Sequence, residues 1–392
     1  MGTTVILPGQ LRLILAITVV HIIAWYAYLG QVPLGLYPTP EERTIIDTAI
    51  GLSEGRTVEG ASLTLYEIAL SFPARLTGSD QALVHSVRFF NALALVLTTA
   101  ACAHAAGIYW RRNRAVWIAG LLTGLNPVLV FWSAEVSPTL PAVLCTSLAF
   151  TLLLRWLRHP SPGRSLIIGL LVSAGLSLET NLIFFTLLWP IVAYLYPHRR
   201  RAAQLAAALA FPALVLLLFT VSTIKLQSTP ELDLENLGQG IYETFNNHEA
   251  YDGKSYGLHK RLNFFLFLNP LHWGLIFILA LAGAYVRLKR GHHGNSIAAL
   301  LICLGIFAIS CALNDTGSKT RALLYPVLAI YTGGIAMLPQ IWAQAGKRTK
   351  RRMVLSLLLV AGLTYTDLYD KGSEGNWETD YSFLAESNLS MG

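Results

Sequence analysis

The organisation of the chain is set by one stretch near its start, TPEERTIIDTAIGLSEG at residues 39–55. It follows the first strongly apolar segment, residues 11–29, and opens a long polar excursion before the next, residues 89–109. Two adjacent carboxylates, Glu41 and Glu42, therefore stand just beyond an expected membrane span. Charges at a membrane boundary in so apolar a chain are its most chemically suggestive feature.

The composition is that of a membrane protein. Of the 392 residues, 54% are hydrophobic and 13% are charged, whereas soluble domains carry about 25% charged residues. The four cysteines lie within apolar segments and lack the spacing of a disulfide framework or a metal site, so we interpret them as packing residues. No cleavage-site pattern follows the first apolar segment, and we expect an uncleaved span there.

Successive apolar windows predict an all-α fold, a polytopic membrane bundle of about 11 transmembrane helices in one integral domain, residues 1–392. The expected spans lie near residues 11–30, 88–109, 115–133, 138–156, 165–179, 182–197, 203–224, 263–286, 296–313, 322–342 and 353–367.

The charges orient this bundle. With the N-terminus in the cytoplasm, the inner loops contain more than half of the 29 Lys and Arg residues and none of the 22 acidic ones. This bias predicts a cytoplasmic N-terminus and an outer C-terminus. Anionic membrane lipids explain the basic loops, and no motif indicates nucleic acid. These loops lie near residues 111–114, 155–164, 198–201, 287–295 and 347–352.

Polar residues gather on the outer face, which indicates a functional site at the outer leaflet. The first outer loop, residues 31–87, is expected to hold two interfacial helices. A second outer loop, residues 225–262, is either a lid that orders on substrate binding or a plain loop. An acidic outer tail, residues 368–392, ends the chain.

The first interfacial helix has clear start and stop signals. Thr39 suits the N-cap, Pro40 the first helical position and Glu42 the third position of a capping box. Gly55 is expected to end the helix. A second amphipathic stretch, residues 62–76, predicts a second such helix.

The acidic pair has both a structural and a catalytic interpretation. Carboxylates in the first helical turn stabilise a helix by about 0.3–1 kcal/mol through its dipole. The capping box explains Glu42 without any catalytic role, but it does not require a second carboxylate at Glu41. Helix amides would also keep Glu41 ionised, as a base that must accept a proton requires.

The run Glu41-Glu42-x6-Ala49-x2-Leu52-x-Glu54-Gly55 resembles the first-loop motif of GT-C-type membrane glycosyltransferases. This superfamily includes the protein O-mannosyltransferases and the lipid A aminoarabinose transferase. The likeness covers residues 10–200 well and the remainder loosely. It continues through Leu65-Tyr66, Phe72, Leu76-Thr77-Gly78, Arg88, Leu125-Asn126-Pro127, Trp132-Ser133-Ala134-Glu135, Lys319, Arg321 and Tyr325-Pro326.

The resemblance implies sugar transfer, with inversion, from a polyprenyl-phosphate donor to a lipid, glycan or protein acceptor. The reaction would take place at the outer face of a bacterial inner membrane. Glu41 is the candidate base. Glu42 would orient that base, coordinate a divalent cation or cap the helix. Glu135 is a third catalytic candidate, unless it is a water-exposed turn residue.

Four further residues are candidates for binding substrate or phosphate: Tyr66, Arg88, Lys319 and Arg321. Cations are needed where negative charge grows on the departing phosphate. Snorkelling to headgroups explains Arg88 equally well, and headgroup anchoring explains Lys319 and Arg321. No metal ligands are assigned among the histidines.

The chain departs from the family pattern at three places. It has Glu41 where Asp is usual, lacks the basic residue before Leu65-Tyr66, and has Glu179 where Lys or His is common. Two other functions therefore stay open. A flippase or transporter of a lipid-linked saccharide would carry charges near the bilayer midplane. A catalytically inactive assembly subunit would tolerate all three departures.

Overall fold

The protein is described here from a computed structural model. The described residues are 8–29, 40–56, 65–77, 79–159, 161–179, 279–280, 282–283, 318–344, 346–348, 350–351 and 354–355. Within these ranges the structure is helical and contains no strand. The expected lid at 225–262, the tail at 368–392 and the spans at 182–197, 203–224 and 296–313 lie outside them, as do most residues of the spans at 263–286 and 353–367. The number of spans therefore stays a prediction.

Six helices build the first half of the bundle, and their order follows the expected spans. They are α1 (Pro8–Leu29), α5 (Asp80–Trp110), α6 (Asn113–Gly124), α7 (Pro127–Ala134), α8 (Thr139–Arg158) and α9 (Pro162–Leu178). Three are long and apolar enough to cross a membrane, and the bent α6–α7 pair would make a fourth among the described residues. The chain is an integral membrane protein.

Two differences from the expected spans have local causes. The helix expected at 88–109 begins earlier, at Asp80, because the Ser79 hydroxyl accepts a hydrogen bond from the Ala82 N–H and caps it. The span expected at 115–133 is broken, with a bend of 51° between α6 and α7. Pro127 has no N–H to continue α6. The Asn126 side chain instead accepts bonds from the first N–H groups of α7.

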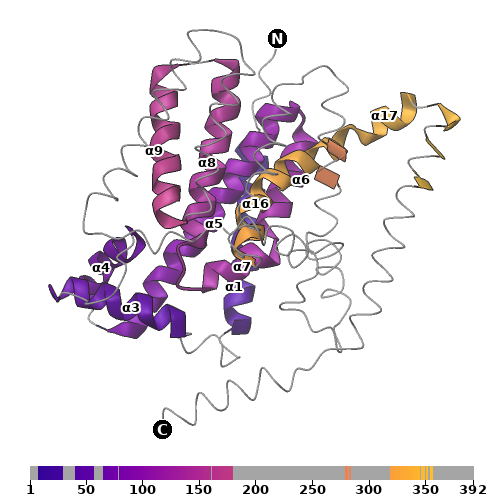
Figure 1. Cartoon of the computed structure of the whole chain (residues 1–392). Coiled ribbons are helices and arrows are strands. Elements are labelled where there is room, and N and C mark those ends of the chain that lie inside the picture. The colour runs from indigo at the N-terminus through magenta and orange to yellow at the C-terminus, as the bar shows by residue number, and fades with distance from the viewer. Residues whose placement is uncertain are drawn as a thin grey trace, which may run out of the picture.

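Two helices lie in the segment that was expected to form the first outer loop, and the first of them ends at the predicted stop signal, whereas the predicted N-cap Thr39 lies outside the described residues. They are α3 (Pro40–Ser53) and α4 (Leu65–Thr77). The Gly55 N–H bonds the Leu52 carbonyl, the Arg56 N–H bonds the Gly51 carbonyl, and Gly55 has a φ of +73°. This is the Schellman motif, which closes a helix on a left-handed glycine. In Figure 1, α3 and α4 lie across the lower end of the upright α8 and α9.

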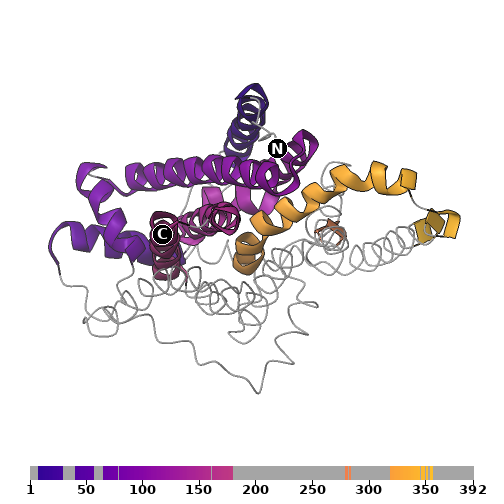
Figure 2. The same ribbon diagram turned by 90° about the horizontal axis from the view of Figure 1, so that it is seen from above.

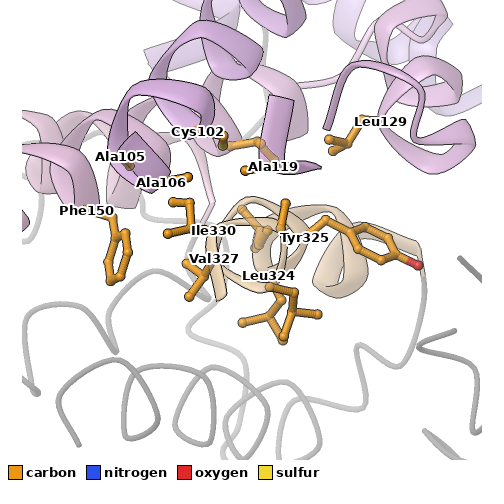
Figure 3. Packing of buried hydrophobic residues seen from close by; sticks show 14 of the residues in the cluster. Cys102, Ala105, Ala106, Ala119, Leu129, Phe150, Leu324, Tyr325, Val327 and Ile330 are labelled. Atoms are coloured by element: carbon orange, nitrogen blue, oxygen red, sulfur yellow. The ribbon is translucent and has the colours of Figure 1, made fainter. Parts of the chain in front are cut away.

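The late segment runs through the middle of the described bundle. It consists of α16 (Ser318–Thr332), a 3₁₀ turn η3 (Gly333–Met337) and α17 (Leu338–Gln344). The expected span at 322–342 is therefore interrupted near Gly333. In Figure 3, Ile330 of α16 lies beside Ala106 of α5, and Tyr325 and Val327 belong to the same buried cluster. The Trp110 indole N–H donates to the Ile330 carbonyl at 2.7 Å, which fixes the far end of α16.

The acidic residues gather at one end of the described bundle. Arginines fill the α5–α6 and α8–α9 connections, at the upper end in Figure 1. The acidic residues of the described ranges lie in α3, α4, the start of α5, the turn after α7 and the end of α9, at the opposite end. The acidic residues are Glu41, Glu42, Asp47, Glu54, Glu67, Asp80, Glu135 and Glu179.

Helix α1 packs at the edge of the bundle through two glycines of α6. Figure 2 shows α1 on the outer side, beyond α5. A methyl group at Gly120 would lie 2.9 Å from the Ile14 side chain, and one at Gly124 would overlap the Thr18 side chain. The two glycines stand four residues apart, the small-residue spacing that lets membrane helices approach closely.

We predict that Gly124→Val separates α1 from α6 and lowers the free energy of unfolding by about 1–3 kcal/mol, the usual cost of overpacking. Thermal unfolding of the purified protein in detergent measures the effect. The matched control is Gly163→Val in α9, because a methyl group there meets nothing within 4 Å. Equal unfolding temperatures for the two variants would contradict the proposed α1–α6 contact.

Candidate functional site

The candidate site is built around the turn that joins α7 to α8, residues 133–138, which we call the α7–α8 turn. It contains Glu135, the C-cap residue of α7. The last carbonyls of a helix have no partners within it. In a membrane bundle, where water is scarce, other donors must satisfy them.

Three side chains from two other helices supply these donors, namely Tyr26, Arg88 and Asn91. The Tyr26 hydroxyl of α1 donates to the Ser133 carbonyl at 2.6 Å. The Arg88 Nε–H of α5 donates to the Ala134 carbonyl at 2.7 Å. Arg88 also places a positive charge at the C-terminal end of α7, where the helix dipole favours one. The end of α7 is therefore closed by tertiary contacts rather than by its own sequence.

The peptide unit that follows Glu135 is bound on both sides. Its carbonyl accepts a bond from the Asn91 Nδ2 of α5 at 2.7 Å. Its N–H, which belongs to Val136, donates to the Glu42 Oε1 of α3 at 2.6 Å. We call this pair of bonds the peptide clamp. Glu42 and Asn91 are 4% and 1% exposed, so water competes little for either bond.

The peptide clamp ties α3 to the bundle. A small hydrophobic cluster surrounds it, in which Ile46 and Ala49 of α3 and Leu70 of α4 pack against the start of α5 and Val136. The Arg75 Nε–H of α4 donates to the Ser53 carbonyl at the end of α3, 3.1 Å away. The helix that carries the acidic pair is thus held against the turn that carries Glu135.

Tyr66 lies beside the peptide clamp. Its ring is 5% exposed, and its hydroxyl has no hydrogen-bond partner within the described residues. Burial raises the pKa of Tyr66 above its ordinary value, the Asn91 side chain lowers it, and the Glu42 carboxylate raises it. The hydroxyl therefore stays protonated at neutral pH and presents its O–H close to both members of the clamp.

A second polar group joins α9 to the same turn. The Ser137 and Thr139 hydroxyls lie 2.9 Å apart, and the Thr139 hydroxyl donates to the Glu179 Oε1 at 2.9 Å. Glu179 caps the end of α9. The carboxylates of Glu42 and Glu179 thus bind opposite ends of the segment 136–139.

The structure gathers four of the residues named from sequence, namely Glu42, Tyr66, Arg88 and Glu135, at the α7–α8 turn. The backbone of Glu41 lies in the first turn of α3, but its side chain is outside the described part. The same holds for Lys319 and Arg321 in the first turn of α16. Their roles stay predictions.

Sequence reasoning missed Tyr26, Asn91 and Glu179 as parts of this site. Asn91 had a signal, because an amide inside an apolar span needs a partner. Tyr26 had no such signal, because tyrosines are common at the ends of spans, where they form the aromatic belt of the membrane interface. Glu179 was noticed only as a departure from the family pattern.

A divalent cation was one of the expectations for this end of the bundle. The described residues contain no group of three or more His, Cys, Asp or Glu side chains that could hold a metal ion. Glu42, which was expected to orient the base, coordinate a cation or cap its helix, binds the Val136 N–H. Cation binding stays a prediction.

We predict that Glu42→Leu loosens the first outer loop and lowers the free energy of unfolding by about 1.5–3 kcal/mol, as expected for a hydrogen bond to a charged group. Glu42→Gln should lose less, because its amide oxygen can still accept the Val136 N–H. Thermal unfolding and hydrogen exchange of the α7–α8 turn measure both effects. The matched control is Asp47→Leu, at an exposed position of α3. Equal losses at positions 42 and 47 would refute the clamp.

Comparison with solved structures identifies the architecture. ArnT from Cupriavidus metallidurans bound to undecaprenyl phosphate matches with a TM-score of 0.55 and 15% identity, over 90% of this chain and 64% of that one. The archaeal oligosaccharyltransferase AglB from Archaeoglobus fulgidus, in complex with an inhibitory peptide and a dolichol-phosphate, matches with a TM-score of 0.50 and 11% identity. That match covers 86% of this chain and 52% of AglB.

These similarities show that the chain shares the helical fold of ArnT and AglB. It spans between about half and two thirds of the length of the structures it matches. No protein-family model and no curated protein matches the sequence.

Proposed function

We propose that the protein is a membrane glycosyltransferase. It moves a sugar from a polyprenyl-phosphate donor to a lipid, glycan or protein acceptor, with inversion at the anomeric carbon. The site lies at the outer face of a bacterial inner membrane, and the N-terminus is cytoplasmic. The observation that carries this proposal is the Glu42–Val136 bond, which holds the acidic helix α3 against the turn that bears Glu135.

The chemistry follows from that juxtaposition. The acceptor hydroxyl or amine attacks the anomeric carbon and passes its proton to a carboxylate, while the bond from that carbon to the phosphate oxygen breaks. Polyprenyl phosphate leaves with the bonding electrons. Glu41 is the base, because it stands in the first turn of α3, where helix N–H groups favour the ionised carboxylate. Glu135 is the second catalytic carboxylate.

The departing phosphate needs positive charge. Arg88 supplies a cation fixed at the end of α7 by its bond to the Ala134 carbonyl. Lys319 and Arg321 are the remaining candidates, because α16 begins at the same end of the bundle (Figure 1). The fold supports this assignment, since undecaprenyl phosphate and dolichol phosphate are bound in the two similar structures.

The described residues favour a transferase over a transporter. Transport would leave charged residues near the bilayer midplane. In the described helices the acidic residues instead gather at one end, around the α7–α8 turn. An inactive assembly subunit is separated from the transferase by the assay that follows.

We predict that Glu41→Gln leaves a folded protein and reduces sugar transfer at least about 100-fold, the usual contribution of a general base. The assay supplies undecaprenyl-phosphate-linked hexoses and pentoses with membrane acceptors, and measures release of free undecaprenyl phosphate. Glu41→Asp should keep most of the activity, because it retains the carboxylate.

The matched control is Glu54→Gln, an exposed carboxylate in the same loop that pairs with Arg56. It should leave transfer unchanged. Full activity of Glu41→Gln would overturn the assignment of the base. A wild-type protein inactive with every donor would overturn the transferase itself and favour the assembly subunit.

A further inference from the structure

We infer that Asn91 is a positioning residue that acts through Glu135. This inference rests on the proposed function, because it assigns a role within that reaction. Asn91 lies in α5, eleven residues into the helix, and its side chain is 1% exposed. A buried amide in an apolar span costs free energy unless its polar atoms are bonded. Here its Nδ2 group is bonded to the carbonyl of a candidate catalytic residue.

The peptide clamp controls one torsion of Glu135. The bonds from Asn91 and to Glu42 bind the two polar groups of the same peptide unit, between Glu135 and Val136. A peptide unit is planar, so fixing both of its polar groups fixes its orientation. The preceding peptide is also bound, because Arg88 donates to the Ala134 carbonyl. With the planes on both sides fixed, the Cα–Cβ direction of Glu135 is fixed too.

This arrangement matters because Glu135 sits outside regular structure. It has φ −87° and ψ 147°, an extended conformation that many residues adopt. Without the bond from Asn91, the following peptide can turn about the Glu135 ψ, so the turn loosens and the Glu135 Cα shifts together with its side chain. A misplacement of about 1 Å at a reacting group can reduce a rate 100-fold. Asn91 therefore preserves the position of Glu135 without contacting the substrate.

Asn91 differs in its partner from Thr99, a second buried polar residue of α5. The Thr99 hydroxyl donates to the Leu95 carbonyl of its own helix, as buried threonines in membrane helices commonly do. The Asn91 amide instead reaches 44 positions along the chain to the α7–α8 turn. Thr99→Val is thus a matched control that removes a buried polar bond of the same helix without touching the turn.

The test is a double-substitution cycle on steady-state transfer from undecaprenyl-phosphate-linked sugars. Asn91→Leu preserves side-chain size and removes the donor, and we expect kcat to fall about 10- to 100-fold with little change in KM for the donor. In a Glu135→Gln background the same substitution should lower kcat less than about 2-fold, because the residue it positions is already disabled. Thr99→Val should leave kcat unchanged in both backgrounds.

A second variant and a second measurement cover the case in which Asn91→Leu does not fold. Asn91→Ser is smaller and too short to reach the carbonyl, so it should give the same pattern. Hydrogen exchange of the α7–α8 turn should be faster in both Asn91 variants and unchanged in Thr99→Val.

Three results would overturn the inference while leaving the transferase intact. These are an unchanged kcat in the Asn91 variants, an equal loss of kcat in both backgrounds, and full activity of Glu135→Gln. An inactive wild-type protein would instead overturn the proposed function, and the role of Asn91 in that reaction would fall with it.

Discussion

The structure at the acidic end of the bundle depends on one constraint: the carbonyls at the end of α7 and the N–H that follows them must find partners in a place with little water. The bonds to Tyr26, Arg88, Asn91 and Glu42 meet this need. Each of these residues belongs to α1, α5 or α3. The need to form hydrogen bonds to the polar backbone groups of one short turn therefore fixes how three helices meet.

The same constraint links fold and chemistry. The Glu42 carboxylate fixes α3 on the bundle, and α3 carries the neighbouring Glu41 in its first turn. The α7–α8 turn that Glu42 binds carries Glu135. The two adjacent glutamates thus have different roles. Glu42 binds α3 to the α7–α8 turn, and Glu41 is the proposed base. A capping box would pair Glu42 with Thr39, which lies outside the described ranges. The structure shows instead the bond from the Val136 N–H to the Glu42 carboxylate.

Local signals in the sequence predicted much of this fold. Pro40 and Gly55 marked the limits of α3, and the apolar windows located α1, α8 and α9 within a few residues. The break between α6 and α7 was missed, although Asn126-Pro127 is a helix-breaking and helix-capping pair. A hydropathy window averages over such a pair, so it reports one span where the chain has two helices.

The contacts of the site could not be predicted from the same signals. The Glu42–Val136 bond joins residues 94 positions apart, and the Asn91–Glu135 bond joins residues 44 apart. Local pattern carries no information on such pairings, which arise from packing. The sequence indicated that Glu42 and Glu135 lie on one face of the membrane. It did not indicate that the Glu42 carboxylate binds the turn that contains Glu135.

The most direct test of the account is an electron cryo-microscopy structure of the full chain with undecaprenyl phosphate. We expect phosphate density between the first turn of α3 and the α7–α8 turn, with the Glu42 carboxylate still bonded to the Val136 N–H. Phosphate at the opposite, arginine-rich end of the bundle, or a first outer loop detached from that turn, would contradict it.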